Sequence, residues 1–345
     1  MDFKVLKRQN LSNIKIKFML NIFYNPSYIK TNKVFLTRSF RHSVFLNYLL
    51  DFNYFFNFPV NENFIQSGPH KRINNLLKTF RNDKLVSFNK FKHDNHYIVQ
   101  FDKFGQDVLD RIISKKNSST KVLIGPLYDL EQNTKLNSLI NKHNFIKKLV
   151  ASERTYLNQP LKDSNFNLEN AVICPSGVIS EEDLLSNILS KSKNGECLIY
   201  FKKREKNDLE KLINFLEFKK QKYNLFEYGH YKNNELKRAA MTNSFGITLS
   251  CAESQGFAIQ ELMASNLPLL IWDQKTNNYG GLDLPASTVT TWNDNCGLIV
   301  DNFNSLKDNF EKFKNNLDSY NPANLVHERL TFEIFNKSLK ELFDF

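Results

Sequence analysis

Two carboxylates in one short segment are spaced so that they could act on the same ligand. Glu253 and Glu261 lie within Ser244–Asp273, a segment that predicts a strand, a loop, a helix and a second strand. In an open parallel sheet, ligands bind outside the carboxyl ends of the strands, where helix N-termini present unpaired amides. We therefore expect both carboxylates on one ligand side, with a diphosphate held by the first amides of the helix. These amides belong to Gly256, Phe257 and Ala258.

Basic residues follow a second predicted strand, Glu196–Lys202. Lys203 and Arg204 come directly after it, and preorganised cations at such a place stabilise the negative charge that grows on a departing phosphate. The sequence leaves open which of the neighbouring cations faces the ligand, and a merely Lys-rich strand end in a Lys-rich chain is the alternative. The candidates are Lys202, Lys203, Arg204 and Lys206.

The carboxylate segment resembles the E-x7-E motif of the GT-B glycosyltransferases, in particular the retaining family 4. The resemblance implies that Glu253 contacts the donor sugar and that Glu261 holds the ribose hydroxyls of the nucleotide. Gly256 matches the glycine that follows the first glutamate of the motif. The sequence departs from the family at Ser254 and Gln255, where a glycine is usually followed by an aromatic or aliphatic residue.

Other segments extend this resemblance in the same order along the chain. The Lys203–Arg204 pair is similar to the basic pair that holds the donor diphosphate. The turn at Gly229, His230 and Tyr231 is similar to the family's turn beside the nucleotide base. Successive strand ends of the N-terminal half also match, with Ile179 in place of the usual aspartate after the last one. They are Val122–Pro126, Lys147–Glu153 and Ala171–Val178.

The resemblance implies a glycosyltransferase that moves a hexose-type sugar from a nucleotide-sugar donor to a glycan, lipid or protein acceptor. Retention by front-face attack, in which the departing phosphate takes the acceptor proton, would require no dedicated base. The sequence holds no Asp-x-Asp pair, so we expect no metal and no other cofactor. Two alternatives stay open: a nucleotide-sugar epimerase on the same fold, and a non-catalytic binding subunit or basic module on nucleic acid.

Two histidines are candidates for a cleft residue that touches the donor sugar or the acceptor. His70 lies in the sequence SGPHKR, and His96 lies in KHDNHYIVQF. A histidine in either setting is more often a surface residue or a structural residue whose hydrogen bonds are satisfied. Both therefore remain hypotheses at this stage.

Strand-like runs alternate with amphipathic helical segments along almost the whole chain, which predicts parallel sheets covered by helices. With the resemblance, the expected fold class is α/β of GT-B type, with two Rossmann-like α/β/α domains facing across a cleft and a C-terminal helix crossing back. We place the acceptor domain at 1–180, with 326–345 packing on it, and the nucleotide-sugar domain at 181–325. The linker is expected within Ser180–Gly195.

The individual elements are expected as follows. Strands in the first half are predicted at Lys15–Phe23, Lys33–Thr37, Tyr54–Phe58, Lys84–Phe88, Tyr97–Phe101, Lys121–Gly125, Phe145–Ala151 and Ala171–Cys174. Strands in the second half are predicted at Glu196–Lys202, Tyr223–Tyr228, Gly246–Ser250, Pro268–Trp272 and Leu298–Asp301. Helices are predicted at Phe104–Ser114, Asp208–Phe218, Asn234–Met241, Phe257–Ser265 and within Asn321–Phe345.

Composition supports a globular chain and bounds its partners. The 345 residues are 41% hydrophobic and 24% charged, and no apolar run is long enough to span a bilayer. The formal charge of +11 fits a solvated Lys-rich surface or peripheral contact with an anionic membrane, and no specific nucleic-acid motif accompanies it. We expect a cytoplasmic protein with four buried thiols. They are Cys174, Cys197, Cys251 and Cys296.

Overall fold

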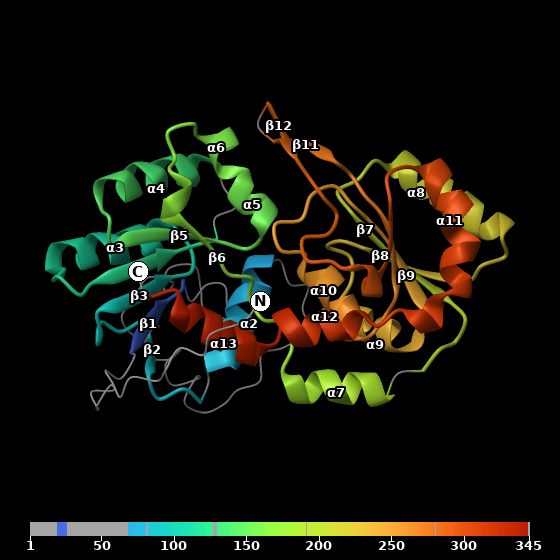
Figure 1. Cartoon of the computed structure of the whole chain (residues 1–345), viewed down its shortest axis with the longest axis horizontal. Coiled ribbons are helices and arrows are strands. Elements are labelled where there is room, and N and C mark those ends of the chain that lie inside the picture. The colour runs from blue at the N-terminus through green and yellow to red at the C-terminus, as the bar shows by residue number, and fades with distance from the viewer. Residues whose placement is uncertain are drawn as a thin grey trace, which may run out of the picture.

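The computed structural model describes residues 19–25, 68–80, 82–126, 130–190, 192–279 and 281–343. These residues form two α/β domains side by side, each built on a parallel sheet (Figure 1). The strands expected at Lys33–Thr37 and Tyr54–Phe58 lie outside the described residues. A membrane-spanning helix is not found in the described part of the chain.

The N-terminal sheet has its strands in the order β2-β1-β3-β4-β5-β6, all parallel. The strands are β1 (Leu20–Phe23), β2 (Val86–Phe88), β3 (Asn95–Ile98), β4 (Lys121–Ile124), β5 (Ile146–Val150) and β6 (Ala171–Ile173). One face packs on α2 and the other on α3 and α4. The helices and helical turns are α2 (Gly68–Phe80), α3 (Lys103–Lys115), α4 (Leu130–Lys142), α5 (Glu153–Leu157), α6 (Gln159–Lys162) and η3 (Leu168–Asn170).

The C-terminal sheet has the order β13-β10-β9-β7-β8, again all parallel. Its strands are β7 (Cys197–Lys202), β8 (Tyr223–Glu227), β9 (Phe245–Ser250), β10 (Leu269–Trp272) and β13 (Gly297–Val300). A separate hairpin, β11 (Thr276–Tyr279) with β12 (Leu282–Pro285), stands toward the N-terminal domain (Figure 1).

Helices cover both faces of this sheet. Residues of α9, α10 and α12 pack on one face, with α7 beside them, and residues of α8 and α11 pack on the other. The elements are α7 (Glu181–Ser190), α8 (Lys206–Phe218), α9 (Asn233–Thr242), α10 (Phe257–Ala264), α11 (Phe303–Asn315) and α12 (Pro322–Arg329), with the short turns η4 (Asp294–Cys296) and η5 (Leu317–Ser319).

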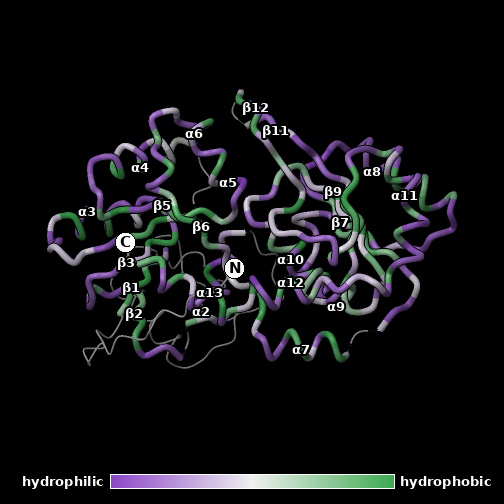
Figure 2. Tube along the Cα trace, in the orientation of Figure 1, coloured by the Kyte–Doolittle hydropathy of each residue, from purple (hydrophilic) through white to green (hydrophobic). Residues whose placement is uncertain are grey.

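Burial on both faces explains the hydrophobic strands. All six residues of β9 are buried, and the strand reads as a nearly continuous apolar run rather than an alternating one. Figure 2 shows the hydrophobic residues concentrated along the strands and the hydrophilic ones along the outer helices and loops. In each domain the hydrophobic core therefore lies between the sheet and the helices that cover its two faces.

The last helix, α13 (Phe332–Glu341), returns to the N-terminal domain. Phe335 packs against Phe80 of α2, with ring centroids 6.1 Å apart, and Lys340 pairs with Asp83 at 2.5 Å. The preceding helix α12 stays in the core of the C-terminal domain, so the chain crosses at Thr331. A Cβ on Gly177 would lie 2.7 Å from the carbonyl oxygen of Thr331, which makes glycine necessary at this crossing.

The predicted fold class is confirmed: two parallel α/β sheets with a C-terminal helix crossing back. The described parts of the predicted strands match observed strands, with ends that differ by a few residues. We did not predict α2, α4, α11 or the β11–β12 hairpin. The hairpin sequence Thr276–Tyr279 is polar, and α2 is rich in Lys, Arg and Asn, so neither has the apolar periodicity that marks an element.

Three of the four thiols are buried as expected. Burial raises the pKa of Cys174 to about 12 and that of Cys296 to about 11, and it also raises the pKa of Cys197. Cys251 is the exception, because it is only half buried and lines the space between the domains. The prediction of four buried thiols is therefore wrong at Cys251, which follows β9 at a strand end open to that space.

Candidate active site

The site lies at the point where the strand order of the C-terminal sheet reverses. Counted along the chain, its strand order is 2-1-3-4-5, so the connections leave β7 and β9 toward opposite edges of the sheet. Ligands bind at such a switch point, outside the carboxyl ends of the strands. Lys202 ends β7 and Ser250 ends β9, and the two residues are aligned in the ladder.

Glu253 is fixed at this switch point by three hydrogen bonds to its carboxylate. The Lys202 ammonium donates to both oxygens, at 2.8 and 2.7 Å, and the Ser250 hydroxyl donates at 2.7 Å. The Glu253 side chain is almost completely buried, while Lys202 also lies over the ring of Tyr228 at 4.8 Å. The carboxylate is therefore held in one orientation and neutralised by its partner.

Gly256 begins α10 in a left-handed backbone conformation, with φ of 79° and ψ of 45°. Glycine adopts this conformation without the steric cost that other residues meet. No side chain caps the start of α10, so the helix presents uncapped amides and the positive end of its dipole. Phe257 and Ala258, the first two residues of the helix, line a cavity of about 150 Å³, which we call the α10 cavity.

Cations and aromatic rings complete the α10 cavity. Lys71 reaches it from α2 of the N-terminal domain, and Lys202 and Lys203 reach it from the end of β7. Tyr231 lines the same cavity and packs edge-on against Tyr200, with ring centroids 6.2 Å apart. Burial raises the pKa of Tyr231, so its hydroxyl keeps its proton. Gly229 occupies the preceding turn with φ of 90° but does not line the cavity.

Glu261 does not share a cavity with Glu253, in contrast to our expectation that both would face one ligand side. It pairs with Lys71 at 2.5 Å, and both side chains are less than 10% exposed. Glu261 lines a different cavity, near Asp183. The loop turns at Gly256 before α10 starts, so the second carboxylate lies farther along the helix, where it meets Lys71 of α2. Lys71, not Glu261, borders the α10 cavity.

The two residues of the predicted basic pair, Lys203 and Arg204, lie in different surroundings. Lys203 is exposed, has a left-handed backbone with φ of 50°, and lines both the α10 cavity and the larger space between the domains. Arg204 instead donates to Asp208 at 3.0 Å and to the Trp272 carbonyl at 2.7 Å, with its guanidinium over the Trp272 ring. Arg204 therefore anchors the start of α8 rather than lining either cavity.

Neither histidine lines these cavities. His96 is buried in β3, where its Nδ1 lies 3.1 Å from the Asn21 amide nitrogen. Burial lowers the pKa of His96 to about 4, so the ring is neutral at physiological pH. His70 is half buried near the start of α2, between two residues that line the α10 cavity, and is not itself a lining residue.

Gln255, which we noted only as a departure from the family motif, joins the two domains. Its amide accepts from the Ser176 backbone N–H at 3.1 Å and donates to the Ser176 carbonyl at 2.7 Å. Arg72 of α2, itself bonded to Tyr97, lies 3.5 Å from the same amide oxygen. The glutamine itself, which is unusual for the motif, was the signal in the sequence. Its hydrogen bonds to Ser176 link the two domains beside the site.

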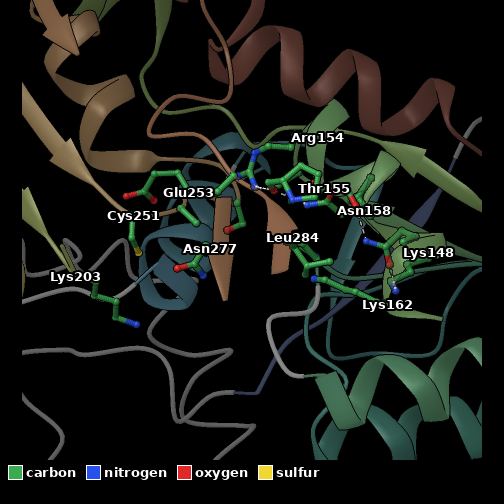
Figure 3. A pocket seen from close by; sticks show the side chains of 18 residues that line it. Lys148, Arg154, Thr155, Asn158, Lys162, Lys203, Cys251, Glu253, Asn277 and Leu284 are labelled. Atoms are coloured by element: carbon green, nitrogen blue, oxygen red, sulfur yellow. Dashed lines mark hydrogen bonds between the residues drawn. The ribbon is translucent and has the colours of Figure 1, made fainter. Parts of the chain in front are cut away.

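A second, larger space opens between the domains on the other side of Glu253. This interdomain cavity has a volume of about 290 Å³. Figure 3 shows Lys148, Lys162 and Arg154 on the N-terminal side, with Glu253, Cys251 and Lys203 on the other. The hairpin closes one end, because Arg154 and Asn158 donate to the Pro285 carbonyl at 3.1 and 2.9 Å. The sequence patterns did not predict a role for Lys148, Arg154 or Lys162.

The two cavities meet at Glu253, Ser254 and Lys203. These three residues therefore border both cavities, which lie next to each other. Within the described part of the chain, no group of three or more His, Cys, Asp or Glu side chains is arranged to hold a metal ion. Positive charge at the junction comes from Lys203, and the start of α10 adds the positive end of the helix dipole.

Comparisons by sequence give no match to any protein-family model or to any curated protein. Comparison with solved structures finds low-identity similarity. AviGT4, a glycosyltransferase involved in avilamycin A biosynthesis, is 9% identical, with 94% of this chain and 97% of that chain covered and a TM-score of 0.47. TarM of S. aureus, solved with UDP, is 14% identical, with 79% and 59% covered and a TM-score of 0.48. Sucrose-phosphate synthase from Thermosynechococcus elongatus is 11% identical, with 74% of both chains covered and a TM-score of 0.46.

Proposed function

We propose that the protein is a glycosyltransferase that uses a nucleotide-sugar donor. The observation that carries the proposal is the junction at the sheet switch point. There, the uncapped start of α10, Lys203 and the fixed Glu253 carboxylate surround the place where the two cavities meet. The helix start suits a diphosphate, and the adjoining cavity has room for the group that receives the sugar.

In this proposal the diphosphate of the donor lies on the amides of Phe257 and Ala258 and near Lys203. As the bond between the anomeric carbon and the phosphate oxygen breaks, both bonding electrons go to that oxygen. Lys203 and the helix end stabilise the charge that develops there. The acceptor hydroxyl forms the new bond to the anomeric carbon, and its proton goes to the departing phosphate. We propose that these groups, rather than a divalent ion, neutralise the leaving group.

Glu253 contacts the donor sugar in this account. Its geometry supports that role, because Lys202 and Ser250 fix the carboxylate at the junction. A side chain held by such partners orients a ligand without losing much conformational freedom on binding. Tyr231 lies on the nucleoside side of the same cavity.

For Glu261 we propose a positioning role. Its carboxylate holds the Lys71 ammonium at the border of the α10 cavity, where Lys71 can reach the ribose or the phosphates. The strand, loop and helix around Glu253, Gly256 and Glu261 support the assignment to the retaining family 4 and its E-x7-E motif. Retention of anomeric configuration is part of the proposal.

The experiment is a transfer assay with a panel of UDP-, GDP- and ADP-sugars. We expect one donor class to release its nucleoside diphosphate, with a product that retains the anomeric configuration by NMR. Glu253→Gln should lower the rate at least tenfold, because a donor contact to a charged group is lost. Lys206→Gln, which removes a nearby cation outside both cavity linings, is the matched control. Release of no nucleotide from any donor, or equal rates in Glu253→Gln and the wild type, would contradict the proposal.

A further inference from the structure

The N-terminal wall of the interdomain cavity gathers positive charge. Lys148, Arg154 and Lys162 line it, and Lys203 lines the opposite side, against a single carboxylate, Glu253. That carboxylate is already engaged by Lys202. Burial, with Arg154 nearby, lowers the pKa of Lys162, and burial, with Lys162 nearby, lowers that of Lys148. The cations of this wall are therefore close enough to repel one another.

Lys148 is the most unusual member of the wall. Its side chain is almost completely buried in β5, yet its only hydrogen-bond partners among the described residues are the neutral amide oxygens of Asn137, at 3.3 Å, and Gln159. The same nitrogen lies over the Phe166 ring at 5.1 Å, so none of its partners carries a negative charge. The nearest acidic group, Asp163, reaches Lys148 only through Asn137.

Arg154 adds a second incompletely used cation. One of its terminal nitrogens donates to the Pro285 carbonyl at 3.1 Å, while its buried Nε has no partner among the described residues. Glu253 and Asp273 attract it from beyond ion-pair distance. A buried N–H without an acceptor costs stability, so a ligand that supplies one would recover that energy.

A purely structural explanation fits these residues poorly. A buried lysine without a carboxylate is costly, and an apolar side chain of similar length would fill the same place without that cost. Cations kept at a cavity wall despite mutual repulsion are typical of a site that binds an anion. The cavity also opens at Glu253 and Lys203, where the transferred sugar would lie.

We propose that this wall binds an anionic group of the acceptor, a phosphate or a carboxylate, and that Lys148 and Arg154 select for it. The inference rests on the proposed glycosyltransferase function and names its acceptor class: a negatively charged glycan or sugar phosphate rather than a neutral one. Lys148 and Arg154 hold the acceptor by its anion, and a hydroxyl on the same molecule then faces the junction. Charge at a fixed place also orients the acceptor relative to the donor.

The test compares the binding of three probes by calorimetry: glucose, glucose 6-phosphate and glucuronate. Titrations are carried out with wild type, Lys148→Met, Arg154→Gln and the surface control Lys103→Gln. The control lies on α3, where Lys103 pairs with Asp107 in an exposed position. Any nucleoside diphosphate that binds is kept saturating, so that the anions cannot occupy the α10 cavity.

We expect at least one charged probe to bind wild type and the Lys103→Gln control at least tenfold more tightly than glucose. This advantage should fall below threefold in Lys148→Met and in Arg154→Gln, while both keep the wild-type affinity for nucleoside diphosphate. Equal binding of charged and neutral probes to wild type, or an unchanged advantage in both variants, would overturn the inference. If anions bind as expected but no nucleoside diphosphate binds, the anion site stands and the proposed donor site fails.

Discussion

The two sides of the cleft handle charge in different ways. On the C-terminal side, Lys202 pairs with Glu253, and Lys203 is exposed. On the N-terminal side, Lys148 and Arg154 have no carboxylate within ion-pair distance among the described residues. The half-buried cation on the C-terminal side therefore has a carboxylate partner, whereas these two basic groups on the N-terminal side do not.

This difference separates positioning from binding. Paired side chains are fixed in place, and the α10 amides and Lys203 are the groups that we propose for phosphate binding. The other wall holds Lys148 and Arg154 without carboxylate partners among the described residues, which costs folding free energy and is expected where a ligand supplies the missing partner. The predictions below concern Glu261, Lys203 and Arg204 first, then Lys148, and last His96.

Removal of Glu261 should give the largest effect on stability. Glu261→Gln leaves the Lys71 ammonium buried without its charged partner, which typically costs about 3–5 kcal/mol. Denaturant unfolding measures this loss. The double variant Lys71→Met/Glu261→Leu should recover most of it, because apolar residues can replace a buried pair. Stability of Glu261→Gln within about 0.5 kcal/mol of wild type would show that the pair is not buried as described.

Lys203 and Arg204 should separate in their effects on catalysis. Lys203→Ala should lower the transfer rate about tenfold to a thousandfold, because a cation beside the leaving group is lost. Arg204→Ala should mainly lower the melting temperature, because Arg204 anchors α8 through Asp208 and the Trp272 carbonyl. Steady-state rates and thermal melts on both variants distinguish the two roles. A larger rate loss in Arg204→Ala than in Lys203→Ala would reverse the assignment.

The burial of Lys148 should be detectable in the pH dependence of stability. Burial lowers the pKa of Lys148 from 10.5 to about 7, so the unfolded chain holds this proton at pH values where the folded chain has released it. Stability from this group therefore rises as the pH increases from 7 to 10, by up to about 3 kcal/mol. Lys148→Met should lack that increment in denaturant unfolding at the two pH values. Parallel curves for the variant and wild type would contradict the lowered pKa of Lys148.

His96 should also make the protein more stable at higher pH, with a smaller change and in a lower pH range than Lys148. Burial lowers its pKa from 6.5 to about 4, so protonation favours the unfolded chain between these values. Stability should fall by about 2 kcal/mol from His96 as the pH drops from 7 to 5, and His96→Asn should flatten that part of the curve. Nucleotide binding by His96→Asn should equal that of wild type, because His96 lines neither cavity. Selective loss of binding in a folded variant would restore His96 as a cleft residue.

The sequence predicted the layout of the C-terminal half well because local patterns determine it. The strand at Phe245–Ser250, the glycine of the loop and the helix that follows all have signals within a few residues. Their position at the sheet switch point then follows from the parallel order of the strands.

The partners of the site residues could not be predicted, because they come from distant parts of the chain. Lys71 lies 190 positions before Glu261, and Gln255 meets Ser176 across the domain boundary. Lys148 sits in a strand whose pattern, Ile-Lys-Lys-Leu-Val, gives no sign that one lysine is buried. Arg204 was selected with Lys203 because adjacent residues look equivalent in a sequence, although their side chains face different surroundings.

The most direct test of this account is calorimetry that compares a nucleoside diphosphate with the corresponding nucleoside, on wild type, Lys203→Ala and Lys148→Met. We expect the diphosphate to bind wild type at least tenfold more tightly than the nucleoside. This advantage should shrink in Lys203→Ala and persist in Lys148→Met, because Lys203 lines the α10 cavity and Lys148 does not. If the diphosphate has no advantage in wild type, or loses it only in Lys148→Met, the assignment of the two walls is contradicted.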